Sequence, residues 1–195
     1  MYLLAHLLAG ILLGILLAYL FQDTRLIPAC AFGSILPDLI DKPVGLLLLA
    51  DTIGYGRIYC HTLLFTGLVL FIGILVYTRY PRIGILFLAL TAGVLSHQVL
   101  DAMWLEPNNW YWPALGPFKG HHLQPDFLRD AFLRTIKNPT EWLAGGIILI
   151  ILIIYSIPRY RAGSAEPGLR QISIPLLLFV IATVLLALVI GIRYR

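Results

Sequence analysis

Residues 83–104 have the sequence IGILFLALTAGVLSHQVLDAMW, an apolar run that carries its few polar side chains near one end. An α-helix rises about 1.5 Å per residue, so a run of this length crosses a hydrocarbon layer of about 30 Å. Similar runs occupy residues 2–21, 62–79, 142–157 and 172–192, each bounded by proline, arginine or a polar cluster. The sequence therefore predicts an all-α protein built as a polytopic bundle of membrane helices.

A further apolar stretch, residues 26–50, is interrupted by residues that disfavour a regular span. The interruptions are Gly33, Ser34, Pro37, Asp38, Asp41, Lys42 and Pro43. Backbone that leaves the helical conformation at membrane depth is tolerated only where protein or water satisfies its polar groups. We expect one broken or re-entrant helix here, which brings the predicted number of spans to five or six.

The composition agrees with a membrane protein. Of the 195 residues, 59% are hydrophobic and 12% are charged, whereas soluble domains average about 45–50% apolar and about 25% charged residues. No polar stretch is long enough to form a second core, so we expect a single integral membrane domain over residues 1–195. Within it, residues 105–141 form an extramembrane segment and 172–192 form the last span.

Basic residues predict how the chain is oriented. The net charge is +4, but its positive residues cluster in short loops and at the C-terminus, which favours membrane lipids over nucleic acid as partners. The loops with Arg79 and Arg82 and with Arg159 and Arg161 are expected on the cytoplasmic side. The N-terminus and residues 51–61 and 105–141 would then lie outside the cytoplasm, in a multi-pass protein of the cell's inner membrane.

The first run lacks a basic leader and a cleavage site, so we interpret it as a retained span.

Two residue groups have simple structural explanations. The aromatic side chains of residues 104–142, among them Trp104, Trp110 and Trp112, favour an interfacial belt, with a substrate-stacking surface or a lid as the alternative. Cys30 and Cys60 lie in apolar surroundings without a CxxC spacing, and we expect them to be small packing residues.

Ionisable side chains near the ends of the predicted spans are the candidate functional residues. Such groups are costly inside a membrane and usually functional. His97 and Asp101 are four residues apart, so they share one helix face, although this spacing alone also fits an ordinary hydrogen-bonded pair. Imidazole and carboxylate groups together are the ligands of zinc and similar divalent ions. The sequence predicts a metal site, with one or two ions, over residues 1–155; its ligands are His6, Asp38, Asp41, His61, His97 and Asp101.

Other polar residues near this side of the membrane leave alternatives open. Arg57 could anchor the chain at the interface or bind a phosphate through two hydrogen bonds. His121 and His122 are either a solvated pair or further ligands, and Glu141 is a third such candidate.

The ordered set His6, Gly33-Ser34-x-x-Pro37-Asp38-x-x-Asp41, Arg57-x-x-x-His61-Thr62 and Ser96-His97-x-x-x-Asp101 resembles a family of membrane-bound metal-dependent hydrolases, the LexA-binding, inner-membrane-associated hydrolases. The resemblance covers residues 1–155. Gly56, Cys60 and Thr62 depart from the family pattern, which has an additional histidine before the arginine and a Thr-His-Ser core.

The ligand order is also similar to that of the zinc-dependent phospholipase C and single-strand nuclease superfamily. That likeness implies that Asp101 bridges two ions, that Asp41, His61 and His97 complete one of them, and that His6 contributes to the other.

These observations predict a metal-dependent hydrolase that attacks a phosphoester or lipid-linked substrate at the extracytoplasmic face with metal-activated water. Zinc is the expected ion, with manganese or another divalent ion as the alternative. Asp38, where it is not a ligand, would act as the general base or orient a histidine, and Arg57 would stabilise negative charge. The alternatives are a transporter or binding protein for divalent cations or protons, whose site should lie near the midplane, and a structural role for the His and Asp residues.

Overall fold

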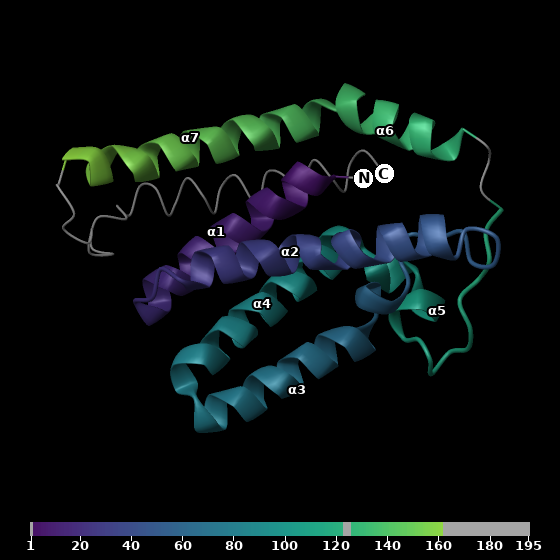
Figure 1. Cartoon of the computed structure of the whole chain (residues 1–195), viewed down its shortest axis with the longest axis horizontal. Coiled ribbons are helices and arrows are strands. Elements are labelled where there is room, and N and C mark those ends of the chain that lie inside the picture. Colours follow the sequence, from purple (N-terminus) through teal and green to yellow (C-terminus); the bar gives the residue numbers. More distant parts are fainter. Residues whose placement is uncertain (1, 123–125, 162–195) are drawn as a thin grey trace.

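The computed structural model describes residues 2–122 and 126–161, and within them all regular secondary structure is helical, with no strand (Figure 1). This confirms the predicted all-α class. The elements are α1 (Leu3–Phe21), α2 (Leu26–Pro43), the π-helical turn η1 (Val44–Leu48), the 3-10 turn η2 (Tyr59–His61), α3 (Leu63–Arg79), α4 (Pro81–Leu100), the 3-10 turn η3 (Met103–Leu105), α5 (Pro107–Trp110), α6 (Phe127–Lys137) and α7 (Pro139–Arg161).

The bundle is organised around α2. This helix packs against α1 on one side and α4 on the other, α3 packs against α4, and α7 lies along α1 (Figure 1). Pro81 starts α4 immediately after α3, where a proline costs no backbone hydrogen bond, so the two helices form a tight hairpin.

Glycines let α2 and α4 approach each other closely near the candidate site. A Cβ atom at Gly33 would collide with the carbonyl oxygen of Leu90 in α4, and one at Gly93 would collide with the carbonyl oxygen of Cys30 in α2. Small residues of this kind allow membrane helices to pack backbone to backbone. His97, one turn beyond Gly93, is thereby brought against α2.

Fewer helices satisfy the requirements of a membrane span than the five to six that the sequence predicts. Within the described residues, α1 and α4 are long and apolar enough, and the bent pair of α6 and α7 raises the number to three at most. The helix α3, expected over residues 62–79, has 17 residues, and α2 carries two aspartates and a lysine. The predicted span 172–192 lies outside the described residues.

The interruption predicted within residues 26–50 is displaced. The helix α2 continues without a break through Gly33, Ser34 and Pro37, and only beyond Pro43 does it widen into η1 and turn back. It does not need to open at its charged residues, because neighbouring side chains and backbone groups neutralise them. The sharp bend, of 58°, lies instead between α6 and α7.

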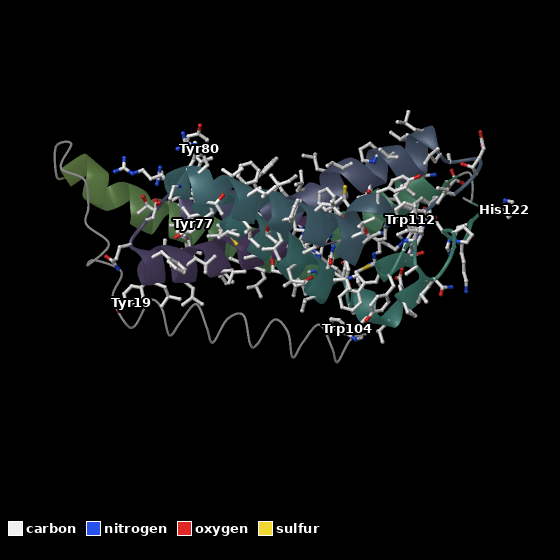
Figure 2. All side chains as sticks on the ribbon, turned by 90° about the horizontal axis from the view of Figure 1, so that it is seen from below. Tyr19, Tyr77, Tyr80, Trp104, Trp112 and His122 are labelled. Atoms are coloured by element: carbon white, nitrogen blue, oxygen red, sulfur yellow. The ribbon has the colours of Figure 1, made fainter. Side chains whose placement is uncertain are left out.

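Aromatic residues mark both ends of the bundle. Figure 2 shows Tyr19, Tyr77 and Tyr80 at one end and Trp104 and Trp112 at the other. Tyrosine and tryptophan gather at the two faces of a bilayer, so this distribution fits helices that cross it. The candidate site lies at the end marked by the tryptophans.

Candidate metal centre

Four of the six predicted ligands meet in one buried cluster. Asp38 in α2, His61 in η2, His97 in the last turn of α4 and Asp101 directly after it each contribute one ligand atom, and these atoms lie within 4.8 Å of one another. His61 and His97 are fully buried, and the two carboxylates nearly so.

The partners of the two imidazole rings determine which nitrogen faces the cluster. Nδ1 of His97 lies 2.7 Å from the carbonyl oxygen of Ser34, and Nδ1 of His61 lies 2.7 Å from Oδ2 of Asp41. A carbonyl oxygen and a carboxylate can only accept, so each Nδ1 carries a proton and donates it. In the neutral form of each ring, Nε2 then carries a lone pair, and the two Nε2 atoms lie 3.0 Å apart.

At this distance, two neutral rings need either a shared proton or a metal cation between or beside the two nitrogens. The ligand atoms of a tetrahedral zinc site, with bonds of about 2.0–2.1 Å, lie about 3.3 Å apart. Here, Oδ1 of Asp38 is 3.6 Å from Nε2 of His61 and 3.7 Å from Nε2 of His97, and Oδ2 of Asp101 is 3.7 Å and 4.0 Å from the same atoms. The donor set and its spacing thus fit a divalent ion after small shifts that separate the two Nε2 atoms and bring the carboxylate oxygens closer.

Asp41 was predicted to be a ligand, but it lies behind His61 and outside the cluster. Its carboxylate accepts hydrogen bonds from the backbone N–H groups of Ile58, Cys60 and His61 at 2.9 to 3.1 Å, besides the bond from the His61 ring. Such a carboxylate fixes the tautomer and orientation of a ligating histidine. Its oxygens are already occupied by these donors, so we assign it to positioning His61.

His6 lies beside the cluster, on a second side of Asp101. Its Nε2 is 3.2 Å from Oδ1 of Asp101, its ring centroid is 4.2 Å from that of His97, and its Nδ1 is held by the carbonyl oxygen of Tyr2 at 2.5 Å. Among the described residues, no group makes a geometrically acceptable hydrogen bond with this buried Nε2. This nitrogen is placed to form an ion pair with Asp101, and its position beside the cluster is also compatible with a further metal ligand.

Each carboxylate of the cluster is also paired with a cation at its rim. Lys42 binds Oδ2 of Asp38 one helical turn away, and Nε of Arg57 lies 2.8 Å from Oδ2 of Asp101. Both cationic side chains remain partly exposed, at 20% for Lys42 and 30% for Arg57. They lie where an anionic substrate could reach them.

Arg57 is itself held by a second carboxylate outside the cluster. Its Nη1 lies 2.6 Å from Oε1 of Glu106, whose other oxygen accepts from Tyr55 at 2.5 Å. Burial raises the pKa of Glu106, but the hydrogen bond from Tyr55 and the charge of Arg57 outweigh it and hold the pKa below its ordinary value. Burial, together with that hydrogen bond, raises the pKa of Tyr55. Glu106 is thus an anion and Tyr55 a neutral donor.

The local charge balance is compatible with a divalent ion. Four carboxylates, those of Asp38, Asp41, Asp101 and Glu106, stand against the two cations Lys42 and Arg57. Buried charges must be compensated, and with neutral imidazoles the deficit equals two positive charges. One divalent cation would remove it.

Several participants were not singled out as site residues from the sequence. Lys42 was noted only as a helix interruption, although its position four residues after Asp38 could have identified the pair. Glu106 and the carbonyl oxygen of Ser34 carry no sequence signal. Gln98 is fully buried and donates to the carbonyl oxygens of Cys60 and Thr62 while accepting from the indole of Trp110, which ties the His61 turn to α4.

The remaining candidates lie apart from the cluster. Glu141 accepts hydrogen bonds from the backbone N–H groups of Leu4 and Ala5, at 2.9 and 3.3 Å, and so caps the start of α1. His121 and His122 are exposed, and the His121 ring stacks on Tyr55. Cys30 and Cys60, which were predicted to be packing residues, are both buried with free thiols.

The fold and the site together define a helical membrane protein with a buried His/Asp cluster at one end of its bundle. A sequence profile of the YdjM inner membrane protein family matches residues 1–194, and the chain belongs to this family. It is therefore an inner membrane protein, as its apolar helices also indicate. No curated protein and no solved structure matches the chain.

Proposed function

We propose that this protein is a membrane-bound metal-dependent hydrolase that acts on a phosphoester or other lipid-linked substrate at the extracytoplasmic face. The observation that carries the proposal is the pair of Nε2 atoms 3.0 Å apart, which lie with two carboxylate oxygens in one buried cluster flanked by partly exposed cations. The resemblance to metal-dependent hydrolases in the order of these same residues supports it.

The chain would hold the ion through His61, His97, Asp38 and Asp101, with His6 available on the far side of Asp101. Zinc is the expected ion, because two imidazoles with two carboxylates form one of its usual ligand sets. When bound, such an ion supplies positive charge that makes a water molecule more acidic and polarises a phosphoryl oxygen.

The cationic side chains at the rim would bind the substrate. Arg57 is held by Asp101 and Glu106 with its guanidinium partly exposed, so it is oriented before any substrate arrives. Lys42 occupies the equivalent place on Asp38. Two fixed cations on either side of the cluster would bind a phosphate group and stabilise the negative charge that develops during its hydrolysis.

Asp38 has one of two roles. Its Oδ1 faces the imidazoles, which supports a ligand, whereas the sequence suggested a general base if the ion leaves that oxygen free. An Asp38→Asn variant that keeps its zinc but loses hydrolysis would support the base, and one that loses zinc would support the ligand.

The position of the site favours hydrolysis over transport. His97 and Asp101 lie at the end of α4, His6 lies in the first turn of α1, and His61 precedes α3. A transport site is expected near the midplane with access from both faces, whereas a hydrolytic site can lie at one interface, where a lipid headgroup meets water.

The first experiment measures metal content. Purified wild-type protein should contain about one or two zinc ions per chain after dialysis, and the His97→Ala and Asp101→Asn variants should contain much less. The matched control is His122→Ala, which removes an exposed histidine outside the cluster. Equal metal content in all four proteins would refute the metal site and leave a structural or proton-carrying role for the cluster.

The second experiment measures turnover. The zinc-loaded protein in detergent is assayed against bis-p-nitrophenyl phosphate, phospholipids and isoprenoid phosphates, with His97→Ala as the inactive comparison and His122→Ala as the active one. Arg57→Gln should keep its zinc but lose hydrolysis. Zinc binding without hydrolysis of any of these substrates, together with zinc flux into vesicles, would support the transport alternative.

A further inference from the structure

The helix α6 has two chemically different faces and lies outside the bundle. Leu128, Phe132 and Ile136 are spaced four residues apart, so they form one apolar stripe, and all three are largely exposed. No residue of α6 is buried. Figure 1 shows the helix beyond the end of α7, set apart from α2, α3 and α4.

Basic residues flank the apolar stripe and occupy the far side of α6. Arg129, Arg134 and Lys137 are exposed, and Asp130 is the single acidic residue of the helix. Arginine and lysine can keep their charge in water while their stems lie along apolar surface. A short helix with an apolar stripe and a basic margin is typical of segments that lie in the surface of an anionic bilayer.

The connection to α7 places α6 at the level of that surface. The two helices meet at a bend of 58°, and α7 continues the apolar run that makes the pair a candidate span. Membrane helices are tilted by about 20° on average and by up to about 40°, so a tilt of about 30° in α7 can bring α6 nearly parallel to the membrane.

Trp142 independently indicates that the junction of α6 and α7 lies at the membrane surface. It lies in the first turn of α7 with 68% of its surface exposed, and its indole N–H donates to the backbone carbonyl of Ile136 at 2.6 Å. Tryptophan prefers the headgroup region, and this bond joins it to the last turn of α6. Glu141, its neighbour, caps α1 at the end of the bundle that holds the metal cluster.

We infer that α6 is a docking surface for anionic phospholipid headgroups, with its apolar stripe in the acyl region and its basic residues against the phosphates. The inference rests on exposure, charge and the bend to α7, and it does not depend on the proposed hydrolase activity.

The test places a nitroxide label on full-length protein reconstituted in vesicles. Phe132→Cys and Asp130→Cys report on the two faces; Cys30 and Cys60 are buried, and the unsubstituted protein labelled in parallel gives the background. Each label is probed with oxygen, which concentrates in the bilayer, and with a water-soluble nickel complex. In phosphatidylglycerol vesicles, the label at position 132 should be reached by oxygen and the label at position 130 by nickel.

The contribution of charge is measured by the label at position 132 in an Arg129→Gln/Arg134→Gln background. Each basic residue shifts binding to an anionic surface by about fivefold, so the double substitution should move this label toward water. Vesicles of phosphatidylcholine alone should have the same effect. The matched control is Arg79→Gln/Arg82→Gln, which removes two exposed arginines at the other end of the bundle and should leave the label in place.

Three results would overturn the inference. A label at position 132 that nickel reaches in both kinds of vesicle would show that α6 stands in water. A label that neither probe reaches would show that a protein surface covers the stripe. A label that stays in the bilayer whatever the lipid charge and the arginine pair would exclude recognition of anionic headgroups.

Discussion

Replacing Asp41 by asparagine tests whether this carboxylate holds His61 in place. In the wild type, its two oxygens accept from the backbone N–H groups of Ile58, Cys60 and His61 and from the His61 ring. Asparagine has the same shape but keeps one accepting oxygen and no charge. Wherever that oxygen is placed, an NH2 group faces a donor that the carboxylate had satisfied.

The size of the effect follows from the number of donors. A hydrogen bond to a charged group contributes about 1.5–3 kcal/mol against about 1 kcal/mol for a neutral one, and removing one partner of a buried ionic network costs about 3–5 kcal/mol. We expect the metal-free variant to lose about 3–5 kcal/mol of its free energy of unfolding, which lowers Tm by about 6–20 °C for a chain of this size. Zinc affinity should fall by about 10- to 100-fold, as for other residues that orient a ligand.

The assay is thermal unfolding of the purified protein in detergent, with zinc removed and with zinc added, together with zinc affinity measured against a competing chelator. The control is Asp23→Asn, the same chemical change in a loop residue paired with exposed Arg25. A metal-free Asp41→Asn protein as stable as the control, with zinc affinity unchanged, would refute the positioning role. Unchanged stability with zinc binding abolished would show that Asp41 is itself a ligand.

Three further substitutions test the surroundings of the site. Gln98→Leu removes a donor from the carbonyl oxygens of Cys60 and Thr62 and the acceptor of the Trp110 indole, so the free energy of unfolding should fall by about 2–4 kcal/mol; a loss under about 0.5 kcal/mol would contradict this. Glu141→Gln weakens the cap of α1, so the amides of Leu4 and Ala5 should exchange hydrogen faster, and unchanged exchange would disprove the cap. Glu106 has a lowered pKa, so its stabilisation is complete above its ordinary pKa of 4.5 and is lost on further acidification. The Tm difference between wild type and Glu106→Gln should therefore shrink in acid, and a growing difference would contradict the assignment.

Much of the local structure could be predicted from sequence, because it depends on short-range periodicity. Most of the run of residues 83–104 lies in α4 (Pro81–Leu100), and the four-residue spacing of His97 and Asp101 places both at its end on one face. The same spacing links Asp38 and Lys42. These results follow from the geometry of a single helix, without knowledge of its neighbours.

The helix breaks were predicted less well, because they depend on whether polar groups find partners. Gly33, Pro37 and the aspartates indicated a broken segment, yet α2 continues through them. Gly33 serves close packing against Leu90, and the two aspartates are satisfied by Lys42, His61 and backbone amides. No pattern within residues 26–50 contains those partners.

Only the tertiary structure decided that Asp38 faces the cluster and that Asp41 positions His61. The two residues are three positions apart with the same side chain, and the sequence gives no reason to separate them. The chain after η1 folds back and presents its amides to Asp41, seventeen to twenty residues away, while Asp38 is left facing the imidazoles.

The sequence by itself determined that this is a helical membrane protein and which imidazoles and carboxylates could share an ion. Only the tertiary structure decided which atoms face that ion, because the groups that occupy the other nitrogens and oxygens come from distant parts of the chain. The carbonyl that fixes His97 lies 63 residues away, in Ser34. A side chain can bind a metal only through the atoms that its other hydrogen bonds leave available. Those hydrogen bonds come from other segments of the folded chain.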